Sequence, residues 1–220
     1  MLISGRGSNM VAVLDALDAG GWPIDVSAVI SNRPEAQGLA VARSRGIHTE
    51  VIDHKAFAAR EAFDDALAQA IEAHAPDLIV LAGFMRILTT PFCEAFAGRL
   101  LNIHPSLLPA YKGLDTHARV LADGGRFHGA TVHAVTAELD HGPILAQAVV
   151  PVLEDDTPSK LAARVLPMEH QLLPMSVIAV LGGLMRLSPA GWVAGSPRPG
   201  FESFEFRPWH VHPNLTHSPD

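Results

Sequence analysis

The chain has 220 residues, a formal net charge of −7, 48% hydrophobic and 18% charged residues, which is typical of a folded globular domain and excludes a disordered chain. The acidic balance disfavours the basic surface of nucleic-acid-binding proteins, and the single cysteine, Cys93, excludes an intrachain disulfide or a cysteine-rich zinc site. With no signal peptide and no apolar run long enough to span a membrane, we expect a cytoplasmic protein that binds neither membranes nor nucleic acids.

The first half of the chain alternates short apolar runs with helical spacing of apolar side chains. In chain order, these patterns predict a strand ending at 2–4, a helix around 10–17, a strand at 26–30, a helix at 36–45, a strand at 51–52, a helix at 63–71 and strands at 78–82 and 100–103. Strands that alternate with helices predict an α/β fold with a mostly parallel, twisted, Rossmann-like sheet and helices on both faces. Ligands of such sheets bind at the carboxyl ends of the strands.

The pattern changes from about residue 129. Weak alternation over 130–135 and a long apolar run over 144–152 predict two adjacent strands. A capping Thr157 followed by Pro158 predicts the start of a helix that runs to about residue 181. Because Pro167 and Pro174 lie inside this helix, we expect it to kink or break there.

The last part of the chain differs in composition from the rest. Residues after 187 are rich in proline and glycine and end in a polar stretch with several histidines. We therefore expect one domain over residues 1–187. Residues 188–220 are expected to form an extended tail that packs on this domain or trails from it.

Two segments follow predicted strands and suit a ligand. Residues 5–9, Gly-Arg-Gly-Ser-Asn, precede a helix whose free backbone amides and dipole attract phosphate, although a tight turn with a serine cap explains the same residues. Residues 83–88, Gly-Phe-Met-Arg-Ile-Leu, suit the lining of a flat pocket for an aromatic ring. An ordinary loop that packs its own apolar side chains is the alternative for them.

Two further segments carry polar side chains. Asn102 and His104 alternate at a strand end, so both project from one face. A histidine alone at such a place is more often structural, but an amide and an imidazole followed by prolines favour a functional site. Asp140 lies in a turn before the next strand, where most aspartates are solvated or cap a turn. Its importance depends on whether it reaches His104, which the spacing leaves open.

Taken together, four motifs in this order resemble the folate-dependent formyltransferases. They are Gly-x-Gly-Ser-Asn near the start, Gly-Phe-Met-Arg-Ile-Leu, Leu-Asn-Ile-His-Pro-Ser-Leu-Leu-Pro and Leu-Asp-x-Gly-Pro. The resemblance extends from residue 2 to about residue 174, and the first two motifs favour the branch of purine biosynthesis. It implies an enzyme that transfers the formyl group of 10-formyltetrahydrofolate to the amine of glycinamide ribonucleotide in de novo purine (IMP) biosynthesis. The resemblance implies no metal, and a monomer or homodimer is expected.

The resemblance also implies roles for individual residues. The implied catalytic residues are Asn102, His104 and Asp140, with His133 in support, and a protonated His104 is expected to donate a hydrogen bond together with Asn102. The residues implied in binding the substrate are Gly7, Ser8, Asn9, Pro105 and Glu169. The residues implied in binding the folate are Arg60, Met85, Arg86, Ile87, Leu88, Asn102, Thr136, Ala137, Glu138, Leu139 and Asp140. The domain would then divide into a phosphate-binding first half and a folate-binding, catalytic second half.

The chain departs from the family at two places. The family usually begins with more apolar residues before Leu2, so we expect a short first strand. Leu-Pro-Met at 166–168 replaces a segment that is often more polar, which leaves Glu169 as the obvious polar contact to the ribonucleotide there.

Other functions are weighed against this one. Formyltetrahydrofolate hydrolase shares the three catalytic residue types but carries a regulatory domain in front of them. Methionyl-tRNA formyltransferase carries an additional carboxyl-terminal domain that helps to bind RNA, whereas the residues after 187 are few and not basic. A nucleotide-binding module without catalysis would keep the phosphate loop alone. A histidine-rich metallohydrolase is disfavoured, because the histidines are scattered and form no HExxH-like pair.

Overall fold

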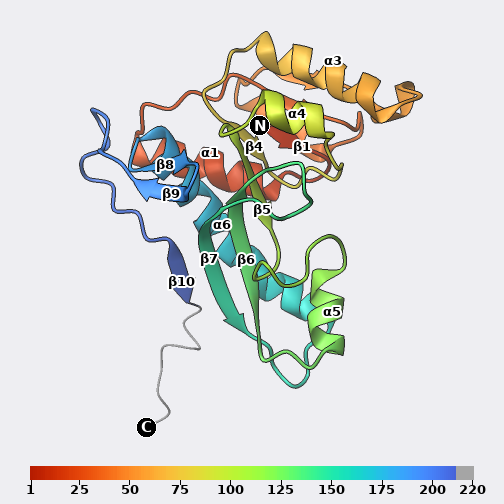
Figure 1. Ribbon diagram of the computed structural model, residues 1–220, viewed down its shortest axis with the longest axis vertical. Coiled ribbons are helices and arrows are strands. Elements are labelled where there is room, and N and C mark those ends of the chain that lie inside the picture. Colours follow the sequence, from red (N-terminus) through yellow and green to blue (C-terminus); the bar gives the residue numbers. More distant parts are fainter. Residues whose placement is uncertain (212–220) are drawn as a thin grey trace.

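An eight-stranded mixed sheet organises the computed structural model, which describes residues 1–211 (Figure 1). The strands of this sheet are β1 (Leu2–Ile3), β2 (Val29–Ser31), β3 (Thr49–Val51), β4 (Ile79–Leu81), β5 (Leu100–His104), β6 (Phe127–Ala134), β7 (Ile144–Pro151) and β10 (Trp209–Val211). The α-helices are α1 (Ser8–Gly20), α2 (Gln37–Ser44), α3 (Arg60–Glu72), α4 (Thr90–Ala95), α5 (Thr116–Ala122) and α6 (Pro158–Leu181), with a short 3₁₀ turn, η1, at His54–Ala56. No described helix is long and apolar enough to cross a membrane.

The strands are arranged in the order β10-β7-β6-β5-β4-β1-β2-β3. All neighbours pair in parallel except β6, which is antiparallel to both β5 and β7. The expected α/β fold with a mostly parallel sheet is therefore confirmed. The expectation of a short first strand also holds, because β1 has only two residues although it lies between β2 and β4.

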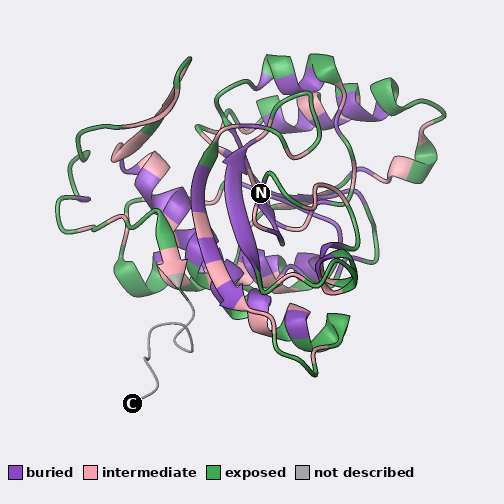
Figure 2. Ribbon diagram, turned by 60° about the horizontal axis from the view of Figure 1, so that its bottom comes forward, coloured by how far each residue is buried: buried purple, intermediate pink, exposed green. Residues whose placement is uncertain are grey.

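Helices cover both faces of the sheet, and the buried side chains fall into two clusters, one on each face. Helices α1, α2, α5 and α6 contribute to one cluster, and α3 and α4 contribute to the other. Along β5 the side chains alternate between these clusters: Leu101 and Ile103 face the α6 side, whereas Leu100 faces the α3 side. The central strands are almost entirely buried (Figure 2).

The buried faces of α1 and α3 follow the predicted helical spacing. In α1 the buried apolar residues are Met10, Val13, Leu14 and Leu17. In α3 they are Phe63, Leu67, Ala70 and Ile71. These patterns hold because a residue at every third or fourth position returns to the same side of a helix.

Helix α6 corrects one part of the sequence expectation, because it runs over 24 residues through Pro167 and Pro174 without a break, while the alternative of a kink stays a prediction. Its start is as predicted: Thr157 accepts a hydrogen bond from the Lys160 amide at 3.2 Å and Pro158 occupies the first turn. Each internal proline forfeits one backbone hydrogen bond. Burial of one whole side of α6 against α1, β6 and β7 offsets that loss.

The chain after α6 is more ordered than the predicted tail. A hairpin of β8 (Met185–Ser188) and β9 (Gly191–Ala194) follows α6, and β10 then pairs in parallel with the edge strand β7. Phe201 between them is buried and stacks on Trp22, with ring centroids 5.5 Å apart. The division of the chain into domain and tail at residue 187 stays a prediction.

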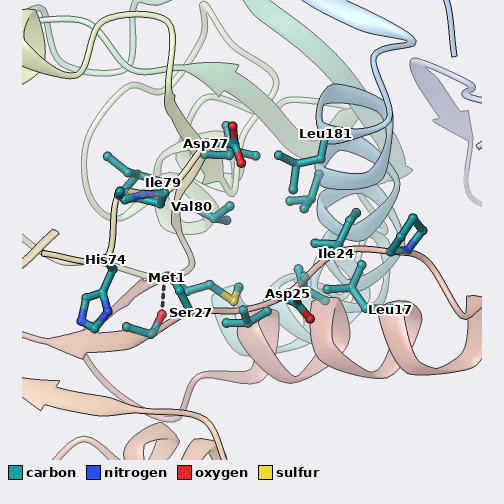
Figure 3. Close-up of a pocket in the computed structure, with 18 of the residues that line it drawn as sticks. Met1, Leu17, Ile24, Asp25, Ser27, His74, Asp77, Ile79, Val80 and Leu181 are labelled. Atoms are coloured by element: carbon teal, nitrogen blue, oxygen red, sulfur yellow. Dashed lines mark hydrogen bonds between the residues drawn. The ribbon is translucent and has the colours of Figure 1, made fainter. Parts of the chain in front are cut away.

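A cavity of about 610 Å³ lies at the amino ends of β1, β2 and β4. Figure 3 shows its labelled lining, with His74 at one margin and Leu17 and Leu181 across from it. The Met1 amino group lies here and donates to the Ala28 carbonyl oxygen at 2.7 Å. This cavity is at the opposite edge of the sheet from the carboxyl strand ends, where the polar residues singled out in the sequence gather.

Candidate active site

Asn102, His104 and His133 lie on one face of two neighbouring strands. Asn102 and His104 project from β5 on the α3 side of the sheet, and β6 places His133 directly opposite Asn102. The Asn102 side-chain nitrogen is 3.1 Å from His133 Nε2, within hydrogen-bond distance. The antiparallel pairing of β5 and β6 therefore brings together two residues that are far apart in the sequence.

Asp140 completes the group from the loop between β6 and β7. Its Oδ2 atom lies 3.4 Å from His104 Nδ1, and its Oδ1 atom lies 3.7 Å from His133 Nε2. The Gly113 amide donates to the same Oδ2 atom at 2.8 Å. Asp140 adopts the left-handed backbone conformation, with φ of 47°, which turns the carboxylate back towards β5. The side chains of His104 and Asp140 are only 7% and 9% exposed.

The environment keeps Asp140 charged. Burial acts to raise the pKa of its carboxyl group, but the close contact with His133, the hydrogen bond from the Gly113 amide and the charge effects of the nearby imidazoles outweigh it. The net result is a pKa below the ordinary value. Asp140 is therefore a carboxylate at neutral pH.

The same environment favours a neutral His104 in the resting site, and the expected protonation of the ring during the reaction stays a prediction. Burial lowers the pKa of His104, and the opposing effects of the Tyr111 carbonyl and of Asp140 are smaller. His104 Nε2 lies 2.9 Å from the Tyr111 carbonyl oxygen, so a neutral ring donates there and leaves Nδ1 unprotonated towards Asp140. A proton gained at Nδ1 would lie next to the Asp140 carboxylate, which stabilises it. The ring is therefore placed to accept a proton.

A small cavity of about 80 Å³ opens beside these residues. Nine of the residues predicted to bind the folate line it: Arg86, Ile87, Leu88, Asn102, Thr136, Ala137, Glu138, Leu139 and Asp140. Arg60 and Met85 are not part of the lining, and Met85 is 62% exposed, so their folate contacts stay predictions. The lining also contains Phe84 of the Gly-Phe-Met-Arg-Ile-Leu motif, and residues that lie outside the motifs, among them Leu81, Cys93 and Val135.

The two loops around the small cavity differ in whether their backbone amides are already hydrogen-bonded. Arg86 places its guanidinium 4.8 Å from the centre of the Phe63 ring, and the Met85 amide donates to Ser4 Oγ at 2.7 Å. In the other loop, no backbone amide of residues 136–140 makes a hydrogen bond within the described chain. These amides are free for a ligand, while the loop is held through its side chains: Asp140 accepts from Gly113, and Glu138 pairs with Lys112 at 3.2 Å.

The predicted phosphate loop lies at the start of α1. Gly7 caps the helix in the left-handed conformation, with φ of 73°, and a side chain there would crowd the backbone of Gly38 at 3.1 Å. Ser8 begins the helix. The next residue, Asn9, donates from its side chain to Glu169 on α6 at 2.7 Å.

Glu169 lies beside Asn9 at the start of α1, and Pro105 lies next to His104; their roles in binding the substrate stay predictions. Burial raises the pKa of Glu169, and the Asn9 hydrogen bond opposes this only in part. The Asn9 side-chain oxygen is buried without a partner among the described residues. Pro105 follows His104 directly, and its carbonyl oxygen accepts a hydrogen bond from Thr116 Oγ1 at 2.7 Å.

Sequence reasoning misses a histidine pair behind the site. His128 Nε2 lies 3.1 Å from His117 Nδ1, and the two rings meet edge to face. Burial, with smaller effects of His117 and His104, lowers the pKa of His128 to about 4. It misses the contacts of Tyr111 and Gly113 too, because backbone atoms make them and leave no signature in the sequence.

Comparisons with known proteins agree on one family. A family model described as formyl transferase matches residues 1–177. Phosphoribosylglycinamide formyltransferase of Escherichia coli (strain K12) is 46% identical over 200 residues, which cover 90% of this chain and 94% of that protein.

Solved structures give the same result. Phosphoribosylglycinamide formyltransferase of Coxiella burnetii, in complex with CHES, has a TM-score of 0.85 and 40% identity and covers 96% of this chain and 97% of its own. Glycinamide ribonucleotide transformylase 1 of Symbiobacterium toebii has a TM-score of 0.84 and 43% identity, with coverage of 89% and 92%.

Proposed function

The chain belongs to the formyl transferase family, and we propose that it transfers the formyl group of 10-formyltetrahydrofolate to the amine of glycinamide ribonucleotide. Its activity is that of a phosphoribosylglycinamide formyltransferase in purine biosynthesis. We assign the reaction to the cytoplasm, where a free thiol such as that of the buried Cys93 stays reduced.

One observation carries the proposal. The side chains of Asn102, His104 and Asp140 bring an amide, an imidazole and a carboxylate together beside the small cavity. Apolar side chains form other parts of the cavity lining. Formyl transfer needs both parts: groups that handle charge and protons, and a slot for a flat ring beside them. A module that only binds nucleotides has no use for this buried set of ionisable groups.

The small cavity suits the ring of a formyl-folate. Phe84, Ile87 and Leu88 supply apolar surface, and the free amides of 136–140 supply donors for the polar edge of a ring. At about 80 Å³ the cavity is smaller than the roughly 300 Å³ at the lower end of ligand pockets. We therefore propose that residues 136–139 shift outwards to admit the ring, while Asp140 stays beside His104. The bound folate supplies an electrophilic formyl carbon.

The attacking amine loses a proton during transfer, and His104 is placed to take it. Its Nδ1 atom is unprotonated in the resting site, and the imidazolium formed by proton uptake faces Asp140 at 3.4 Å. The ring then returns the proton towards the leaving nitrogen, directly or through water. Such general acid–base help is worth about a hundredfold to ten-thousandfold.

Negative charge develops on the formyl oxygen as the amine attacks. The Asn102 amide is the fixed donor for this oxygen, and β5 and the contact to His133 hold it in position. A single donor of this kind is worth roughly 3 kcal/mol. The proposed reaction uses no metal, because the formyl carbon is already electrophilic and the leaving nitrogen departs protonated.

The ribonucleotide is proposed to bind on the α1 side of the site. Its phosphate would meet the start of α1 at Gly7 and Ser8, where unpaired backbone amides and the helix dipole favour an anion. Asn9 and Glu169 then offer polar atoms to the rest of the ligand, among them the unpartnered Asn9 side-chain oxygen.

The acceptor decides between this function and its alternatives. Purified protein is mixed with 10-formyltetrahydrofolate and glycinamide ribonucleotide, water alone or charged initiator tRNA, and deformylated folate is followed spectroscopically. We expect turnover only with the ribonucleotide. Turnover with water alone would instead indicate a formyltetrahydrofolate hydrolase. Folate binding without turnover on any acceptor would indicate a module without catalysis.

A further inference from the structure

Three potential metal ligands meet at the edge of the sheet, outside the active site. This edge cluster consists of His48, just before β3, Glu50 within β3, and His74, just after α3. One ligand atom from each residue lies within 4.8 Å of the other two. The two imidazole rings pack together with centroids 5.1 Å apart and a tilt of 48°.

The backbone positions of the edge cluster are fixed by the fold. The His48 carbonyl oxygen accepts a hydrogen bond from the Val29 amide at 2.9 Å, and Glu50 pairs with Ile30 of β2. The His74 amide donates to the Ile71 carbonyl oxygen at 3.0 Å in the turn that ends α3. Side-chain rotation alone therefore has to bring the three ligand atoms closer.

The side chains of the edge cluster face the same side of the sheet. Ile30 packs in the cluster under α3, so Glu50, which is in register with it, faces α3, and His48 two residues earlier does the same. The nearby cation points elsewhere, because Arg43 is bonded to Thr49 Oγ1 at 2.8 Å on the opposite face.

The Glu50 charge is uncompensated. The carboxylate makes neither a hydrogen bond nor an ion pair with any residue between 1 and 211. Two imidazoles and a free carboxylate at one place form a donor set with a net negative charge, which attracts a divalent cation.

We propose that the edge cluster binds one Zn²⁺ ion through His48, Glu50 and His74, with water as the fourth ligand. Imidazole and carboxylate ligands at about 2.0–2.2 Å in tetrahedral geometry lie roughly 3.4 Å from one another, so the present separations close by small rotations. Figure 3 shows His74 at the margin of the large cavity, which gives an ion a second approach besides the exposed His48 side.

The bound ion would cross-link the edge strand β3 to the end of α3. Within residues 1–211, strand β3 pairs with β2 alone, so such a link stabilises a strand that has a partner on one side. The resemblance implies no metal in the reaction, and the sequence contains no HExxH-like histidine pair. The edge cluster is a different kind of site, because its residues come from two separate elements, at strand β3 and at the end of α3.

The test is a Zn²⁺ titration of the full chain by calorimetry after treatment with EDTA and desalting. All proteins carry His212→Ala and His217→Ala, so that the two histidines after residue 211 contribute nothing. The cluster variants are His48→Ala, His74→Ala and Glu50→Gln, and the matched control is His141→Ala, which removes an exposed histidine. Co²⁺ replaces Zn²⁺ in a parallel titration, because its visible absorption distinguishes tetrahedral sites from the hydrated ion.

We expect one equivalent of Zn²⁺ in the parent and in the control, and an affinity at least tenfold weaker in each cluster variant. Zn²⁺ should raise the unfolding temperature of the parent but not that of Glu50→Gln, whose side chain keeps its size. Formyl transfer should be unchanged by EDTA and by all three substitutions, so this result is separate from the proposed function. No binding by the parent, or equal binding by all variants, overturns the proposal.

Discussion

The Asp140 carboxylate lies 3.4 Å from the His104 ring nitrogen Nδ1, although the two residues belong to a loop and a strand that are distant in the sequence. This contact joins a base that is neutral at rest to a group that stabilises its charged form. The most direct predictions concern this pair.

Asp140→Asn should lower kcat for formyl transfer by about a hundredfold to ten-thousandfold, because the imidazolium of His104 loses its counter-charge. His104→Ala should have a similar effect, and the double variant should lose little more, since the two residues act as one unit. Steady-state transfer assays measure this, and circular dichroism checks the fold. Asp65→Asn, an exposed change on α3, is the control. Near-normal kcat in both single variants would contradict the assigned roles.

Asn102→Ala should lower kcat by roughly a hundredfold to a thousandfold, with a smaller effect on KM, because the lost donor acts on charge that appears only during attack. The change also removes the partner of His133 at 3.1 Å. For this reason His133→Asn is measured alongside Asn102→Ala. It should lower kcat less, because His133 acts on the reaction only through Asn102 and Asp140. A loss confined to KM in Asn102→Ala would place the amide in binding instead.

The pH dependence of kcat/KM should follow His104, which must be neutral to accept a proton. Since burial lowers its pKa below the ordinary 6.5, the rate should stay level around pH 7 and fall only at lower pH. Asp140 acts to raise the pKa of His104, so the fall should move to still lower pH in the residual activity of Asp140→Asn. An acidic limb that begins above pH 7 in the parent protein would refute this assignment.

His128 should make stability depend on pH. Its pKa is lowered to about 4 in the folded protein from 6.5, so the unfolded chain binds more protons between these values. The contribution of His128 to the free energy of unfolding should therefore be fully present above about pH 6.5. It should decrease as pH falls towards 4, by up to about 3 kcal/mol. Urea unfolding at pH 5 and 7.5 measures the difference, which should shrink in His128→Gln but not in His141→Gln. Equal differences in all three proteins would rule the effect out.

Glu169→Gln and Asn9→Ala should each raise KM for the ribonucleotide about tenfold while kcat changes little, because one polar contact in binding is worth about that factor. KM for the folate should not change, since neither residue lines the small cavity. Initial rates with each substrate varied in turn separate the two. An increase in the folate KM alone would contradict the placement of the ribonucleotide at α1.

Much of the fold follows from local patterns. Apolar runs and helical spacing predict the strands up to β5 and helices α1, α2 and α3, because each pattern reflects one buried face. Helices α4 and α5 have six and seven residues, too few for such a pattern to stand out. The sequence pattern misses the hairpin β8–β9 and strand β10 for a different reason, because their proline- and glycine-rich surroundings are typical of irregular chain. Strands β8 and β9 form by pairing with each other, and β10 forms by pairing with β7.

The candidate site also has parts that the sequence predicts and parts that it does not. Asn102 and His104 share a strand and a face, which spacing alone predicts. Their meeting with Asp140 depends on the reversal of β6 and on a left-handed turn, neither of which a single sequence encodes visibly. The lowered pKa of His104 arises from burial within the assembled fold, which the residue type alone does not show. Edge-cluster residues belong to separate elements and become neighbours only in three dimensions.

The positive φ of Asp140 restricts what evolution or a protein engineer can place at this position. Aspartate and asparagine tolerate that backbone shape, whereas longer or β-branched side chains resist it. Glutamate, the usual conservative exchange for aspartate, would therefore strain the turn as well as overreach the imidazole, and its effect could not be read as chemistry alone. Asparagine is the informative replacement. The turn and the reaction both restrict the residue at this position, so a substitution that harms one tends to harm the other.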